Sequence, residues 1–437
     1  MNSRSLRRMG GLLFALAAAL PGMVTQAAEK PDKISIGITA FLSGPASVFG
    51  EPAKAAAEIM IEDLNAAGGI DGVPLEATFV DEGAGGEQLL AEYRRLVQDV
   101  GVDAMFSAIS SGNCNKIAPL AEDLKILNIM WDCGTQRIFE EGKYRFVFRT
   151  QANATPEMLA TVLYLLKTKP DFKTIAVVNQ DYAWGRESWK IFSTALKALK
   201  PDVEIVAELF PKFGSPDYST EISRLSALRP DVVLSTSWGG DLDTLVRQSA
   251  QRGLMQRSTF VLPLVESSLQ RLGKDLPEGV IVGGRGDHYF LHPEFKNDAD
   301  FQSFNEKFKA KTGSYPIYPV FHISQALAAL KGAYEKAITT NNGEWPDHEQ
   351  VIEAMNGLEF KGLGRTVRLR EDHQGLEDQM LGTTKHVPEY DFAVMDNMMI
   401  FPAEAITTPV GQVSEEWVQN LSPDLLNLEV DTYQHGS

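Results

Sequence analysis

A polar loop at residues 109–115 (I-S-S-G-N-C-N) carries side chains suited to hold a small anion. It follows a strand-like run and opens a helix-like run, so Ser110, Ser111 and Asn113 lie beside backbone N–H groups at a helix start. Hydroxyls and such N–H groups can together bind a carboxylate. The same side chains could instead only cap the helix, and the residues alone leave both interpretations open.

A second loop, residues 131–135 (W-D-C-G-T), follows the next strand-like run. Its acid, Asp132, could meet a ligand amine or could simply cap the turn. Because the carboxyl ends of parallel strands meet at one edge of a sheet, the two loops should lie close together.

Other patterns that support chemistry are sparse. His288 and His292 have i,i+4 spacing, but Gly286 and Pro293 disfavour a helix there, and no third metal ligand is evident. The sequence has no G-x-x-x-x-G-K-[ST] phosphate loop and no G-x-S-x-G nucleophile elbow. We therefore expect no metal, no cofactor and no catalytic residue. For Arg285 and His288, which lie near a predicted crossover, we expect structural roles, with contact to the ligand as the alternative.

Strand-like and helix-like runs alternate along the chain, first from about residue 30 and again from about residue 174. This alternation predicts an α/β fold with two doubly wound parallel-sheet lobes. The expected strands are Lys33–Phe41, Leu75–Asp81, Ala104–Ile109, Leu127–Trp131, Phe146–Arg149, Thr174–Asn179, Glu204–Leu209, Asp231–Thr236, Thr259–Leu262 and Val280–Gly283. After Gly364 the pattern weakens to two further strands, Thr366–Arg370 and Phe392–Met395, and residues 401–437 are expected to be a loop-rich tail.

The first 27 residues have the pattern of a cleaved export signal. Three arginines precede a short apolar run, Gly11–Leu20, and small residues near Ala27 offer a cleavage site. The run is too short to span a bilayer as a helix. We therefore expect a mature protein of about 410 residues in the bacterial periplasm.

Charge and length restrict the function further. The net charge is −17, and removal of residues 1–27, which contain three arginines and no acid, makes it −20. Such a charge argues against nucleic-acid and anionic-membrane partners, and we expect a soluble monomer. A chain of this length exceeds one hydrophobic core, so two domains are expected.

The only two cysteines, Cys114 and Cys133, lie on the two polar loops. In an oxidising compartment an even pair of cysteines typically forms a disulfide. Neighbouring loop ends can bring two Cα atoms within the ~4.4–6.8 Å that the bond needs. We predict this disulfide, with two free buried thiols as the alternative.

Four segments in this order resemble one family. They are S-G-P-A-S-V-F-G at 43–50, N-A-A-G-G-I-D-G at 65–72, N-Q-D-Y-A-W-G at 179–185, and the run from D-V-V-L-S-T-S-W to R-G-L at 231–254. The resemblance is to the branched-chain amino acid-binding (leucine/isoleucine/valine-binding-like) group of type I periplasmic binding proteins, which serve ABC importers. It covers roughly residues 33–395.

The resemblance implies a clamp of two lobes joined by three hinge crossovers near Thr150, Gly284 and Gly364. Lobe I would comprise 28–150 and 285–362, and lobe II would comprise 151–284 and 363–400. A ligand would bind in the cleft at the carboxyl ends of the strands, and the lobes would close on it by a hinge motion.

The resemblance also implies roles for individual residues. Ser111 matches a serine that holds the ligand carboxylate, and the backbone of Gly134 and Thr135 matches the second carboxylate-holding loop. Phe49, Trp184 and Trp238 fall where the family often has tyrosines that close over the ligand, with Tyr182 beside them. Ordinary core packing is the alternative for each ring. Tryptophan in place of tyrosine favours a larger, flatter or more apolar ligand than valine.

One departure concerns the ligand amine. The family's ammonium-binding acid aligns near Leu264, and the nearest acid here is Glu266, two residues further on. If Glu266 does not reach the cleft, the ligand is expected to lack an α-amine, because a buried unpaired ammonium is costly. The predicted protein delivers a small organic acid, an amino acid or an aromatic or aliphatic carboxylate, to the membrane permease subunits of an ABC importer and performs no chemistry. The alternative is a periplasmic ligand-sensing module for a membrane receptor.

Overall fold

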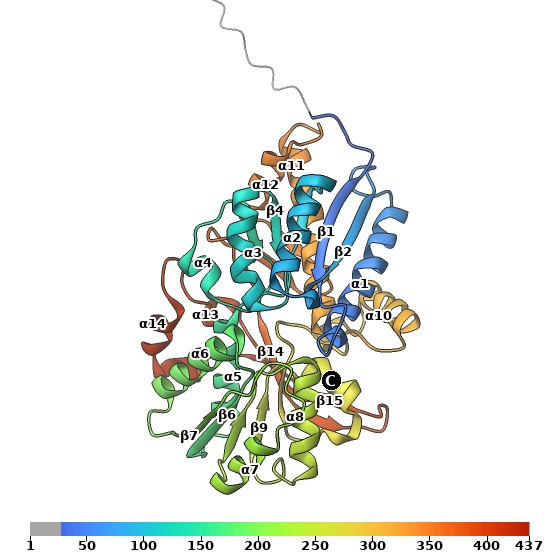
Figure 1. Ribbon diagram of the computed structural model, residues 1–437. Helices are drawn as coiled ribbons and strands as arrows, with labels where there is room; N and C mark the ends of the chain where they lie inside the picture. Colours follow the sequence, from blue (N-terminus) through green and yellow to red (C-terminus); the bar gives the residue numbers. More distant parts are fainter. Residues whose placement is uncertain (1–27, 437) are drawn as a thin grey trace, which may run out of the picture.

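The computed structural model describes residues 28–436, which form two stacked α/β lobes (Figure 1). The predicted signal peptide, residues 1–27, lies outside the described residues. Within residues 28–436 no helix combines the length and apolar character needed to cross a bilayer.

The first sheet is parallel throughout and has the order β2-β1-β3-β4-β5. Its strands are β1 (Ile34–Ala40), β2 (Leu75–Asp81), β3 (Ala104–Phe106), β4 (Leu127–Met130) and β5 (Val147–Arg149). β1 is almost entirely buried, as expected of a parallel strand covered by helices on both faces. The helices of this lobe are α1 (Ser47–Ala66), α2 (Gly86–Arg95), α3 (Ser111–Leu124), α4 (Arg137–Glu141), α10 (Ala299–Thr312), α11 (Tyr318–Thr340) and α12 (His348–Met355).

The second sheet has the order β16-β15-β14-β10-β9-β8-β6-β7. Its parallel strands are β6 (Thr174–Val178), β7 (Glu204–Leu209), β8 (Val232–Leu234), β9 (Thr259–Leu262) and β10 (Ile281–Gly283). β14 (Gln379–His386), β15 (Ala393–Phe401) and β16 (Asp431–Tyr433) add an antiparallel edge. The helices are α5 (Ala154–Thr168), α6 (Ala183–Leu199), α7 (Ser219–Leu228), α8 (Gly239–Gln251) and α9 (Leu269–Leu272).

The predicted α/β class with two parallel-sheet lobes is confirmed, and each of the first ten expected strands has a counterpart. The long antiparallel pair of β14 and β15 was anticipated only in part, because β14 mixes polar and apolar residues without a clear alternation. A small sheet of β11 (Glu359–Lys361), β12 (Thr366–Leu369) and β13 (Gly375–Leu376) lies near the crossovers.

The segment from residue 401 onward contains more structure than a loop-rich tail suggests. It forms α13 (Ala403–Ile406), α14 (Ser414–Gln419), a 3₁₀ turn (Pro423–Asn427) and β16. Ser414 is fully buried, and its hydroxyl bonds to Thr155 of α5 and to Glu140 of α4. The segment therefore contacts both lobes beside the hinge.

Candidate functional site

The loops at the carboxyl ends of the two sheets face each other across a narrow cavity of about 10 Å³, which has room for little more than one water molecule between the closed lobes. The lobes touch directly beside this cavity, where the N–H of Gly240 donates to the carbonyl of Pro45 at 3.2 Å. The cavity is lined by Phe49, Ile109, Ser111, Gly134, Tyr182, Trp184, Trp238, Leu264, Arg285 and Tyr318. Six of these residues, Phe49, Ser111, Gly134, Tyr182, Trp184 and Trp238, are among the predicted site residues.

Aromatic rings from both lobes form most of the cavity wall. The ring centroid of Phe49, in lobe I, lies 5.3 Å from that of Trp238, in lobe II, and 4.9 Å from that of Tyr318. The indole N–H of Trp238 donates to the hydroxyl of Tyr182 at 2.6 Å, and that of Trp184 donates to the carbonyl of Thr236 at 2.9 Å. The N–H groups of both indoles are thus already hydrogen-bonded within the protein, so the two rings contribute apolar area to the cavity wall.

Residues of the first polar loop, 109–115, either bond to Glu82 or line the cavity. The N–H groups of Ile109 and Ser110 and the side-chain amide of Asn113 all donate to the carboxyl group of Glu82. Burial raises the pKa of Glu82 to about 7 in spite of these hydrogen bonds. Ser110 and Asn113 therefore donate their hydrogen bonds to the buried acid Glu82, whereas Ser111 lines the cavity at the start of α3.

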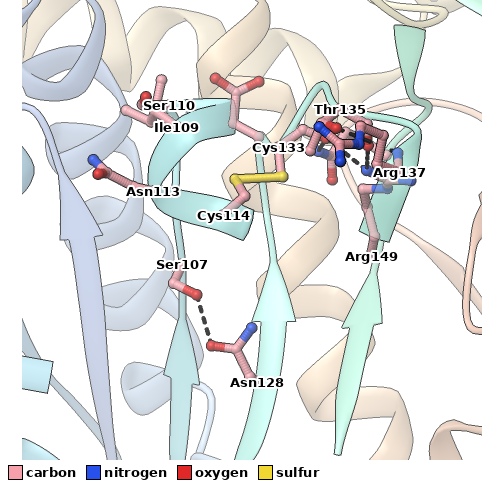
Figure 2. Close-up of a disulfide and its surroundings, with 12 residues drawn as sticks. Ser107, Ile109, Ser110, Asn113, Cys114, Asn128, Cys133, Thr135, Arg137 and Arg149 are labelled. Carbon is pink, nitrogen blue, oxygen red and sulfur yellow. Dashed lines mark hydrogen bonds between the residues drawn. A yellow bond between two sulfur atoms is a disulfide. The ribbon is translucent and has the colours of Figure 1, made fainter. Parts of the chain in front are cut away.

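The second polar loop, residues 131–135, is fixed by hydrogen bonds from Arg149 and Gln151 to its backbone carbonyls. The guanidinium of Arg149 donates from Nη1 to the carbonyls of Cys133, at 3.0 Å, and Thr135, and Gln151 donates to Cys133 as well (Figure 2). The predicted disulfide joins Cys133 to Cys114 on α3, with 6.2 Å between the Cα atoms. These bonds order the loop that carries Asp132 and Gly134.

Gly134 permits close approach of the two lobes. A Cβ atom at this position would lie 2.5 Å from the ring of Trp184 and 3.0 Å from Nη2 of Arg285. Only glycine allows the indole and the guanidinium to approach this loop so closely.

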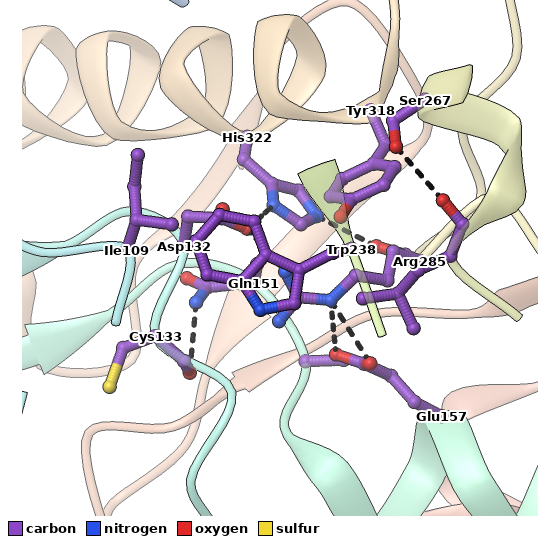
Figure 3. Close-up of polar contacts among 12 residues, drawn as sticks. Ile109, Asp132, Cys133, Gln151, Glu157, Trp238, Ser267, Arg285, Tyr318 and His322 are labelled. Carbon is purple, nitrogen blue, oxygen red and sulfur yellow. Dashed lines mark hydrogen bonds and ion pairs between the residues drawn. The ribbon is translucent and has the colours of Figure 1, made fainter. Parts of the chain in front are cut away.

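Arg285, which follows β10 at a crossover, is the centre of a buried charge network (Figure 3). Its Nη1 donates to Asp132 Oδ1 at 2.7 Å, and its Nε donates to Glu157 at 3.1 Å. The guanidinium lies 5.0 Å from the ring centroid of Trp184 and 5.3 Å from that of Tyr318, within cation–π range. One guanidinium thus bridges acids from both lobes and borders the cavity.

Asp132 and His322 share a proton within this network. His322 Nε2 lies 2.7 Å from the carbonyl oxygen of Arg285, which can only accept, so Nε2 carries a hydrogen. His322 Nδ1 then lies 2.5 Å from Asp132 Oδ1, a distance that requires a proton between the two atoms. Burial raises the pKa of Asp132 and of Glu157 to about 7, and burial lowers the pKa of His322. The second oxygen of Asp132, Oδ2, is buried without a hydrogen-bond partner in the described chain.

The remaining predicted residues lie outside the cavity wall. Glu266 is 2% exposed and accepts a hydrogen bond from the N–H of Tyr318 at 2.9 Å, and burial raises its pKa to about 8. Thr135 is buried, and its hydroxyl accepts from the N–H of Arg137 at 3.3 Å. Glu266 does not line the cavity, so the wall lacks the acid at the position expected to hold a ligand amine.

Sequence reasoning missed four lining residues, Ile109, Leu264, Arg285 and Tyr318. The position of Arg285 directly after a strand-like run was an available signal, although we expected a structural role for it. Tyr318 carried no such signal, because it begins α11 and follows no strand-like run.

A histidine cluster lies next to this network. Donor atoms of His288, His322 and Glu377 all lie within 4.8 Å of one another. His288 Nε2 already pairs with Glu377 at 2.6 Å, and both ring nitrogens of His322 are engaged. A metal ion would therefore have to displace existing hydrogen bonds.

Comparison with known proteins is consistent with this geometry. The sequence profile described as periplasmic binding protein matches residues 33–385. The chain is 25% identical over 360 residues, 82% of this chain and 90% of the relative, to the leucine-, isoleucine-, valine-, threonine- and alanine-binding protein of Pseudomonas aeruginosa. It is 25% identical to the Leu/Ile/Val-binding protein of Escherichia coli over 57% of this chain and 67% of the relative.

Solved structures of the same fold include two from Rhodopseudomonas palustris. One is a solute-binding protein of an ABC transporter in complex with 3,4-dihydroxybenzoic acid, with a TM-score of 0.73 and 18% identity over 87% of this chain and 99% of the other. The second, in complex with benzoate, has a TM-score of 0.70 and 18% identity over 83% and 95% of the two chains.

Proposed function

The chain belongs to the periplasmic binding protein family, as a solute-binding component of an ABC importer, and we propose that its cleft clamps a small aromatic carboxylate. The observation that carries this proposal is the cavity wall itself. Rings from both lobes surround the space, while one guanidinium, Arg285, and one hydroxyl at a helix start, Ser111, border it. A flat ring with one carboxylate would match apolar walls and these donors.

The placement of Glu266 supports a ligand without an α-amine. This acid is bonded to the backbone of Tyr318 and lies outside the wall. A ligand ammonium would then be left with Asp132, which already pairs with Arg285. Relatives with printed ligands include binders of aliphatic amino acids and binders of benzoates, so both classes belong in the test.

An amino acid is the second candidate, because one observation favours it. Asp132 Oδ2 is fully buried without a partner, and an ammonium group would satisfy it. Asp132 itself is not among the residues that line the cavity, so it would have to turn Oδ2 toward the ligand while Oδ1 keeps its bond to Arg285.

Ligand screening of stripped protein separates the two candidates. The mature chain would be unfolded and refolded to remove carried ligand, and benzoate, hydroxybenzoates and leucine would then be tested by thermal shift and calorimetry. A ligand present at 100 times its Kd should stabilise the protein by about 2.7 kcal/mol. Stabilisation by benzoates alone supports the proposal, whereas stabilisation by leucine alone overturns it.

We further propose that the mature protein acts as a periplasmic monomer after cleavage near Ala27, delivers its ligand to the permease subunits, and catalyses no reaction. N-terminal sequencing of exported protein, light scattering, and recovery of chemically unchanged ligand would test these three points. A membrane receptor in place of a permease remains the alternative partner, and co-purification with permease subunits in the ligand-bound state would distinguish the two.

A further inference from the structure

A second cavity, of about 340 Å³, lies beside the hinge and against the loop that bounds the ligand cavity. Three parts of the chain line it. They are the α4 region from Gln136 to Lys143 in lobe I, the hinge residues around Arg149 and Arg370, and the C-terminal segment 407–413. No residue lines both this cavity and the ligand cavity.

Arg149 brings to this cavity a buried guanidinium that has no close ion pair in the described chain. Its side chain is fully buried, and its Nε and Nη1 donate to neutral oxygens of Gln374, Cys133 and Thr135. Within residues 28–436 its Nη2 has no hydrogen-bond partner and no carboxylate forms a close ion pair with it, although Asp372, Glu140 and Glu157 stabilise its charge from further away. A buried guanidinium nitrogen without a direct partner is unfavourable, and an anion bound beside Nη2 would supply one.

The other charged groups of the lining differ in how far they are paired. Asp372 accepts hydrogen bonds from Nε and Nη2 of Arg370, and Glu141 pairs with Arg137. Lys143 is exposed, whereas Glu140 accepts a hydrogen bond from Ser414 and forms no ion pair in the described chain. Glu140 is therefore the one lining acid whose charge would oppose an anion.

We propose that this cavity binds a small oxyanion, such as phosphate or a carboxylate, with Arg149 Nη2 as its principal donor. Gln136, whose Oε1 also lacks a partner, can turn its side-chain amide by 180° and present its NH₂ group. Because Arg149 also holds the carbonyls of Cys133 and Thr135, a bound anion would stiffen the loop that carries Gly134.

Inorganic phosphate is the probe for this site. The full mature chain would be titrated with phosphate by calorimetry and thermal shift at pH 7, with sodium chloride at equal ionic strength as the reference. Saturable binding of one phosphate per chain, beyond any effect of chloride, is expected. Equal, non-saturating effects of the two salts would overturn the proposal.

Two matched variants locate the binding. Val413→Trp introduces a large ring into the cavity lining, whereas Val410→Trp introduces the same ring nearby, outside the lining. Val413 is 43% exposed and Val410 is 41% exposed, so both variants should fold. Val413→Trp should weaken phosphate binding at least tenfold, and Val410→Trp should leave it unchanged. Equal affinities in both variants would place the phosphate elsewhere and overturn the proposal.

Two further variants test the charges. Arg149→Gln should abolish phosphate binding, and Glu140→Gln, which keeps an acceptor for Ser414, should strengthen it severalfold. If Arg149→Gln does not fold, the phosphate affinities of Val413→Trp and Glu140→Gln decide whether the proposal holds. An unchanged or weaker phosphate affinity in Glu140→Gln would contradict binding of an anion in this cavity.

Discussion

Asp132 Oδ1 lies 2.5 Å from His322 Nδ1 and also accepts a hydrogen bond from Arg285 at 2.7 Å. The acid from the β4 loop, the imidazole from α11 and the guanidinium from the crossover after β10 thus meet at one oxygen atom. The network couples the ligand cavity to the hinge, because Arg285 borders the cavity and also pairs with Glu157 of α5 in lobe II.

Loss of the Arg285 guanidinium should destabilise the protein strongly. Arg285→Gln leaves Asp132 and Glu157 buried without their cation, and removal of one partner of a buried pair typically costs about 3–5 kcal/mol. The cost should be smaller at pH 5 than at pH 8, because both acids have pKa values raised to about 7 and become neutral at the lower pH. Urea unfolding at the two pH values measures both effects.

Arg186→Gln is the matched control for this variant. Arg186 pairs with Asp181 at the surface, where an ion pair contributes up to about 1 kcal/mol. A loss of stability in Arg285→Gln no larger than in this control would contradict the role of Arg285.

Truncation of Trp238 should weaken ligand binding more than it weakens the ligand-free fold. Trp238 packs against Phe49 and Phe41 of the opposite lobe and against Tyr182 and Phe213 of its own, so opening of the cleft removes part of its packing. We expect Trp238→Ala to raise the Kd for benzoate at least tenfold, about 1.4 kcal/mol, with little change in the melting temperature of the stripped protein. Calorimetry and thermal unfolding check the two parts.

Trp189→Ala supplies the contrast. Trp189 packs on Phe192 within lobe II and donates to Glu208, away from the cavity. Its truncation should cost on the order of 3 kcal/mol of stability, as in other cores, with the affinity of the folded fraction unchanged. If Trp238→Ala behaved in the same way, its ring would be core rather than ligand wall.

Neutralising Glu266 should stabilise the protein at alkaline pH. Its pKa is raised to about 8 by burial, so the folded protein favours the neutral acid. The stability that comes from this proton is fully present below the ordinary pKa of 4.5 and is lost as the pH rises through about 8. The free energy of unfolding of Glu266→Gln should therefore exceed that of wild type by on the order of 3 kcal/mol near pH 8.5 and should differ little from it near pH 4.5.

Unfolding free energies across this pH range, measured beside the exposed variant Glu359→Gln, test the prediction. Parallel pH profiles for wild type and Glu266→Gln would show that Glu266 ionises freely in the folded protein.

Removal of the disulfide should affect both stability and binding. A loop closed across a separation of 19 residues stabilises the fold by roughly 3 kcal/mol in the chain-entropy model. Cys114→Ala/Cys133→Ala should lose about this much and should also bind ligand more weakly, because Cys133 belongs to the loop of Gly134. Denaturation and ligand titration of this double variant, compared with oxidised wild type, measure both losses, and wild type under reducing conditions should show the same losses. Unchanged affinity would show that Arg149 alone orders the loop.

Much of the architecture could be predicted from the sequence because it depends on local patterns. The apolar runs that became β1, β6 and β8 have the length and composition of buried parallel strands, and the alternation with helices specifies two sheets of this class. The same argument located the loops after β3 and β4, since a ligand site in such folds lies beyond the carboxyl ends of the strands. The pairing of Cys114 with Cys133 followed from that placement.

The tertiary structure alone decided which predicted polar groups face away from the cavity and which further groups join its wall. Ser110 and Asn113 bond to Glu82, a residue 28 positions before Ser110, and no local pattern reveals that partner. Tyr318 and His322 reach the cleft from α11, and Arg285 reaches it from a crossover, because packing of three distant chain segments orients their side chains. Periodicity in a sequence reports which face of an element is buried, whereas the choice of partner across a cleft depends on how whole lobes meet.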